Sequence, residues 1–231
     1  MKNPQWKMYL CYLPGLLAMA CVARAVPDLY AMIPNRDENT WWLGIAAAVI
    51  VFGMAIAAHC LAKGGRGGYW LSYGLTAVGT GGIIGILYGE MGWTVTLPTL
   101  LYALLPAAVL ALMLCLNSLR EGKRGHRIVD AAVLILDLAL IVAAIVIWVK
   151  WHHVFGSFAF FCGICHLFFQ MACLFAGDKP EGKWRYLSFS GFWAFAVIAV
   201  VVVIVLAEGE ALDGLDLDLP IGDKKKNTKK M

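Results

Sequence analysis

Apolar residues along the chain gather into seven long blocks, which short segments rich in charged residues and glycine separate. An α-helix needs about 20 apolar residues to cross the hydrocarbon layer of a bilayer. The blocks therefore predict seven transmembrane helices, at residues 8–26, 41–62, 69–89, 93–116, 131–151, 152–176 and 190–209. We expect residues 1–209 to form one all-α, polytopic helix bundle in the lipid bilayer. Residues 210–231 read as an acidic and then basic C-terminal tail.

Composition supports the same class. Hydrophobic residues make up 61% of the 231 positions and charged residues only 15%, against roughly a quarter charged in soluble domains. Tryptophan and tyrosine recur at the block ends, as in the aromatic belts of membrane proteins. The connecting loops are too short to hold a soluble domain.

The basic residues are distributed unevenly between the two predicted sides of the membrane. The side that holds the N-terminus would carry eleven of them, and the other side only Arg24, Arg36 and Lys150 when the tail is set aside. Because positive charge is retained on the cytoplasmic side, we expect a cell-membrane protein with a cytoplasmic N-terminus and an extracytoplasmic C-terminus. The net charge of +4 comes from these loops and the tail, so it does not indicate nucleic-acid binding.

The first block has a second interpretation as a signal peptide. It combines a basic start, an apolar stretch and an Ala-Arg-Ala sequence at 23–25 that resembles a cleavage site. Cleavage there would leave six spans, with both ends outside the cytoplasm.

Two connecting segments are similar to each other. CLAKGGRGGYWLSYG at 60–74 and CLFAGDKPEGKWRYLSFSG at 173–191 share a Cys-Leu pair, a basic loop with glycine and an aromatic cluster. The similarity suggests two parallel three-helix units joined by the fourth helix, a repeat pattern found in small transporters. The alternative is chance, because such loops commonly contain glycine, lysine and tryptophan.

Polar side chains inside the apolar blocks are the candidates for chemistry. Cys162, His166 and Gln170 are spaced four residues apart and would share one face of the sixth helix. Asp137 is the one carboxylate well inside a block, and counting from the block edges puts Asp137 and Gln170 both about 9 Å deep, with His166 one turn deeper. Thr76 of the third helix would lie at comparable depth. An ionised carboxylate in hydrocarbon costs at least a few kcal/mol, so it requires a partner. The structural alternative is that Asp137 only locks two helices together.

The stretch FCGICH at 161–166 contains the Cys-x-x-Cys-His pattern of covalent haem attachment. Ligation would require both thiols at the outer face, whereas Cys162 would lie about 15 Å below it. Cysteine inside an apolar helix usually behaves as a small apolar residue. A non-covalent haem would need two facing histidines, and His59 and His166 differ in depth by about 10 Å. We therefore expect no cofactor, with haem as the alternative.

The third block, YGLTAVGTGGIIGILYG at 73–89, places small residues at four-residue spacing. Such spacing lets helices approach closely in membranes. The run lacks the strand and the Gly-Lys-Ser/Thr sequence of a phosphate loop, so we interpret it as a packing surface.

These features favour a small transporter or channel-like protein. In this hypothesis Asp137 holds a cation or proton, His166 relays or coordinates, and Gln170 with Thr76 orients a small polar solute. Two alternatives remain: a non-catalytic subunit that docks on other membrane subunits, and an electron-transfer anchor that contacts haem or quinone. No nucleophile–base pair or metal-ligand set stands out, which favours a protein that is not an enzyme.

Overall fold

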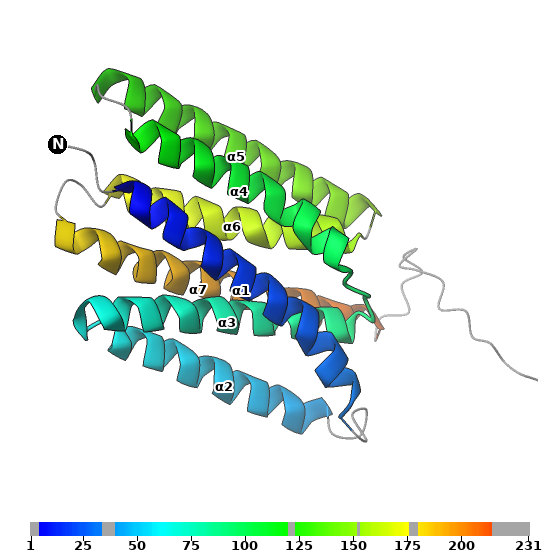
Figure 1. Cartoon of the computed structure of the whole chain (residues 1–231). Coiled ribbons are helices and arrows are strands. Elements are labelled where there is room, and N and C mark those ends of the chain that lie inside the picture. Colours follow the sequence, from blue (N-terminus) through cyan, green and yellow to red (C-terminus); the bar gives the residue numbers. More distant parts are fainter. Residues whose placement is uncertain (1–4, 34–39, 120–122, 152, 176–179, 214–231) are drawn as a thin grey trace, which may run out of the picture.

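The computed structural model describes residues 5–33, 40–119, 123–151, 153–175 and 180–213. These residues form seven α-helices and no strand (Figure 1). The helices are α1 (Gln5–Ala31), α2 (Thr40–Leu61), α3 (Gly65–Glu90), α4 (Leu97–Leu119), α5 (Lys123–Trp151), α6 (Val154–Phe175) and α7 (Pro180–Asp213). The predicted all-α bundle is confirmed.

Six helices are long and apolar enough to cross a membrane, so the chain is a multi-pass membrane protein. For α2, only the part Val49–Leu61 could be compared with the length of a span, and that part alone is shorter than one. Crossing by α2 stays a prediction. From residue 214 onward, the predicted tail lies outside the described residues.

Two helices begin well before their apolar blocks. Helix α5 starts at Lys123 rather than at residue 131, and α7 starts at Pro180 rather than at residue 190. Proline is favoured in the first turn of a helix, where its missing N–H has no partner to lose. Both helices thus include basic residues that the sequence had suggested for loops.

Helices α3 and α6 lie inside the bundle, while α2 and α5 lie at opposite edges (Figure 1). Helix α7 packs against both α3 and α6, and α1 packs against both α3 and α4. These contacts join the two halves of the chain. The proposed three-helix units pack differently from one another, because α1 contacts α3 whereas the described parts of α5 and α7 do not touch.

Glycines of α3 allow α1 to approach closely. A Cβ at Gly81 would lie 2.4 Å from the carbonyl oxygen of Met19, and one at Gly85 would lie 2.5 Å from the Cβ of Val26. The packing role predicted for this run is confirmed at these two positions. It is wrong for Gly74 and Gly82, where an added Cβ meets nothing within 4 Å. Since α1 covers Gly81 and Gly85, they do not offer a docking surface to another subunit.

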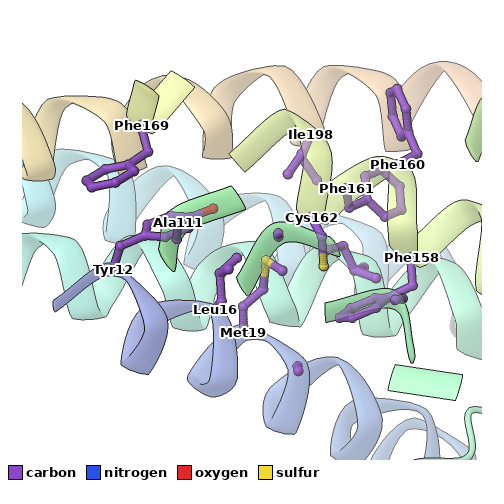
Figure 2. Packing of buried hydrophobic residues seen from close by; sticks show 14 of the residues in the cluster. Tyr12, Leu16, Met19, Ala111, Phe158, Phe160, Phe161, Cys162, Phe169 and Ile198 are labelled. Carbon is purple, nitrogen blue, oxygen red and sulfur yellow. The ribbon is translucent and has the colours of Figure 1, made fainter. Parts of the chain in front are cut away.

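Aromatic and sulfur-containing side chains fill the region where α1 meets α6 (Figure 2). The ring of Tyr12 stacks on Phe169 with centroids 4.3 Å apart. The sulfur of Met19 lies 3.7 Å from the sulfur of Cys165. This apolar packing surrounds the few polar side chains of the interior.

Candidate functional site

The centre of the candidate site is a carboxylate–imidazole pair between two apolar helices. Asp137 lies midway along α5 and His166 midway along α6, and their exposed fractions are 1% and 0%. Asp137 Oδ2 is 3.2 Å from His166 Nδ1. Asp137 and His166 therefore lie next to each other, as the sequence predicted. Their role in binding stays a prediction.

The two groups are close but not aligned for a hydrogen bond. Among the described residues, Asp137 Oδ2 and both ring nitrogens of His166 have no hydrogen-bond partner, and neither do the Tyr12 hydroxyl and Gln170 Oε1. Buried polar groups in proteins are nearly always paired. The unsatisfied atoms of Asp137 and His166, which lie 3.2 Å apart, indicate a place where a ligand, a proton or water completes the bonding.

A cavity of about 90 Å³ adjoins Asp137, and residues of α4, α5 and α6 line it. Among the described residues that line it, Asp137 is the only one with an acidic or basic side chain. The rest of the wall is almost entirely aliphatic, with alanines from all three helices: Ala103, Ala107, Ala143, Ala144 and Ala159. The cavity exists because alanine side chains are small, and the Asp137 carboxylate is the polar group in its wall.

Gln170 does not join this pair. Its Nε2 donates a hydrogen bond to the backbone oxygen of Asp130, at 2.9 Å, and seven residues of helix, about 10 Å, separate Asp130 from Asp137. The prediction that Gln170 and Asp137 share one depth was wrong, because α5 begins before its apolar block and counting from the block edge misplaced it. Gln170 instead ties α6 to the first turns of α5.

Thr76 also lies apart from Asp137. Its Oγ1 donates a hydrogen bond to the backbone oxygen of Tyr73 at 2.8 Å, and it lines a separate cavity of about 20 Å³. That volume holds about one water molecule. Tyr12 lines the same cavity, and its ring centroid is 5.9 Å from that of His166. Tyr12 is thus the structural connection between Thr76 and the pair.

Two polar residues near the α4–α5 connection were missed in the sequence. Asn117 Nδ2 donates to Asp130 Oδ1 at 3.0 Å, and Asn117 is 95% buried, with an exposed fraction of 5%. The available signal was an asparagine just after an apolar block and an aspartate just before the next. Both positions fell outside the predicted spans and were assigned to the loop.

The Cys-x-x-Cys-His stretch is part of the packed interior of α6. Cys162 is buried and lines the cavity beside Asp137, and Cys165 packs against Met19. His59 is exposed on α2, a helix that has no contact with α6 in the described structure. His59 is thus exposed on α2 whereas His166 is fully buried in α6, which does not favour ligation of one haem by both. Within the described residues, no three of the side chains that bind metals gather in one place.

Comparison with protein-family models, with curated proteins and with solved structures finds no match. Fold and site together define a multi-pass helical membrane protein with a buried carboxylate–imidazole pair.

Proposed function

We propose that the protein is a small transporter and that the Asp137–His166 pair is its transport site. The observation that carries this proposal is the placement of Asp137. Its carboxylate is buried within a membrane-spanning helix, 3.2 Å from an imidazole nitrogen and at the wall of a cavity of about 90 Å³. Ionisable residues inside membrane segments commonly mark pathways for ions, protons or substrates.

The opposite charges of an imidazolium at His166 and a carboxylate at Asp137 support the exchange of a proton for another cation. With His166 protonated, its imidazolium neutralises the Asp137 carboxylate across 3.2 Å, an attraction of about 5 kcal/mol at an effective dielectric constant of roughly 20. Removing one partner of a buried ion pair costs about 3–5 kcal/mol. In the proposed cycle, a solute cation that reaches Asp137 replaces the imidazolium as the partner of the carboxylate. This substitution couples proton release to cation binding.

The alternative functions have less support from the described structure. Gly81 and Gly85, which would dock a partner subunit, pack against α1. Of the two histidines that would hold a haem, His59 is exposed and His166 is fully buried. The remaining competitor is a structural lock, in which the pair only fastens α5 to α6. A lock and a transport site respond differently to a neutral replacement of the carboxylate.

The test uses the full-length protein reconstituted in lipid vesicles that contain a pH-sensitive dye. Inorganic cations, amines, amino acids and sugars are added outside in turn, and proton movement is recorded. We expect at least one solute to drive proton movement in the wild type, and Asp137→Asn to abolish it. Asp28→Asn, which neutralises an exposed carboxylate on α1, is the matched control and should behave as the wild type.

Equal proton movement in the wild type and Asp137→Asn for every solute would overturn the proposal. If that result came with a lower stability of Asp137→Asn in detergent, the pair would be a structural lock.

A further inference from the structure

The cavity beside Asp137 narrows the chemistry of any ligand that it accepts. Twelve of its thirteen lining residues are alanine, glycine, proline, leucine, isoleucine, phenylalanine or cysteine, and Asp137 is the thirteenth. A ligand that fits must therefore present one positive charge to the Asp137 carboxylate and an apolar surface elsewhere. One oxygen of this carboxylate, Oδ2, accepts no hydrogen bond from the described side chains and backbone.

Inorganic cations do not suit this wall. Calcium and magnesium need about six or more oxygen ligands, and potassium filters replace the hydration shell with rings of carbonyl oxygens. This cavity contributes a single carboxylate side chain. A cation that binds here must therefore require few oxygen ligands or hydrogen bonds. An alkylammonium ion meets this condition because its methyl groups form no hydrogen bonds.

Sugars and amino acids do not suit it either. A sugar carries several hydroxyl groups, and an amino acid carries a carboxylate besides its ammonium group. Inside this aliphatic wall those groups would be buried without partners, which opposes binding.

The volume sets the size of the ligand. An apolar cavity of about 150 Å³ admits benzene, so by proportion a cavity of about 90 Å³ has room for about four non-hydrogen atoms. We infer that the ligand of this site is a small protonated alkylamine of the size of dimethylammonium. Its N–H group donates to the Asp137 carboxylate, and its methyl groups lie against alanine side chains such as Ala107 and Ala144.

The inference rests on the proposed function, because it names the cation that would exchange with the proton of His166. It also specifies what binding requires: an ionised Asp137 and the empty space next to it. The two requirements can be removed separately, one by a change of charge and the other by a change of volume.

The experiment is equilibrium binding of radiolabelled dimethylammonium to purified full-length protein in a non-ionic detergent at neutral pH. We expect saturable binding, with an affinity at least tenfold weaker in Asp137→Asn. Ala144→Leu should also weaken it at least tenfold, because the three added carbons take up most of a space for about four atoms. The matched control is Ala139→Leu, the same substitution on an exposed position of α5, which should bind as the wild type.

Competitors test the class of ligand. Trimethylammonium should displace the label, whereas tetraethylammonium is too large and propan-2-ol has no charge, so neither should. Ala107→Leu fills the cavity from α4 and serves as a second variant if Ala144→Leu does not fold.

Three results would overturn the inference: no saturable binding, equal binding by the wild type and Asp137→Asn, or displacement by propan-2-ol. Absence of amine binding together with Asp137-dependent transport of another solute would refute the ligand class and leave the transporter proposal standing. Amine binding that depends on Asp137, without transport of any solute, would support the ligand class and refute the transporter proposal.

Discussion

Replacement of Gly81 by alanine should separate α1 from α3. Non-bonded carbon and oxygen atoms rarely come closer than about 3.3 Å, and the new Cβ would lie 2.4 Å from the carbonyl oxygen of Met19. The oxygen belongs to the backbone, so α1 itself must shift by roughly 1 Å to restore a normal contact. Such overpacking typically costs about 1–3 kcal/mol.

The substitution also has a stabilising component. Alanine is favoured over glycine in a helix by about 0.5–1 kcal/mol. The neighbouring substitution Gly82→Ala has this gain alone, because its Cβ meets nothing within 4 Å. The gain in helix propensity is the same in both variants, so the difference between their free energies of unfolding gives the cost of overpacking at Gly81. Gly81→Ala should therefore be less stable than Gly82→Ala by about 1–3 kcal/mol.

The assay is unfolding of the purified protein by SDS in mixed micelles, followed by circular dichroism or tryptophan fluorescence. Wild type, Gly81→Ala and Gly82→Ala are titrated side by side, and the free energies of unfolding are compared. Equal stability of the two variants, or greater stability of Gly81→Ala, would refute the conclusion that α1 and α3 pack backbone against backbone at Gly81.

Three further predictions concern other parts of the bundle. The hydroxyl of Ser188 donates to that of Ser72 between α7 and α3, so a double-mutant cycle with alanine should give a coupling of about 0.6 kcal/mol, the average for such bonds in a membrane. Asn117→Ala should lower the free energy of unfolding by about 1 kcal/mol, because Asp130 Oδ1 loses a buried donor; the SDS assay measures this too. A reporter enzyme that is active only outside the cytoplasm should be active when fused to the C-terminus.

The helices were predictable because hydrocarbon imposes a minimum length of apolar sequence, and that length is visible residue by residue. The helix ends were not, because a helix does not stop where the hydrocarbon does. Helix α5 continues outward to Lys123 and α7 to Pro180, since basic side chains are stable in a helix once it has reached the headgroups.

The carboxylate–imidazole pair was predictable because Asp137 and His166 each stand out as a charged or titratable side chain within an apolar stretch of helix. The partner of Gln170 was not, because a backbone carbonyl such as that of Asp130 has no signature in the sequence. The place of Thr76 depends on how α3 is rotated about its axis. That rotation is set by the contact of Gly81 and Gly85 with α1, which hydrophobic patterning does not show.

Helices α1 and α2, which leave the ribosome before α3, have no contact with each other in the described structure, whereas both contact α3. Membrane helices associate through close packing rather than through the hydrophobic effect, so α1 and α2 alone have no native interface to form. Assembly must wait until α3 enters the membrane and presents Gly81 and Gly85 to α1. Until then α1 remains a separate helix in lipid, open to quality-control proteases and to insertion factors. The appearance of α3 in the membrane is therefore the point in synthesis at which α1, α2 and α3 can begin to pack.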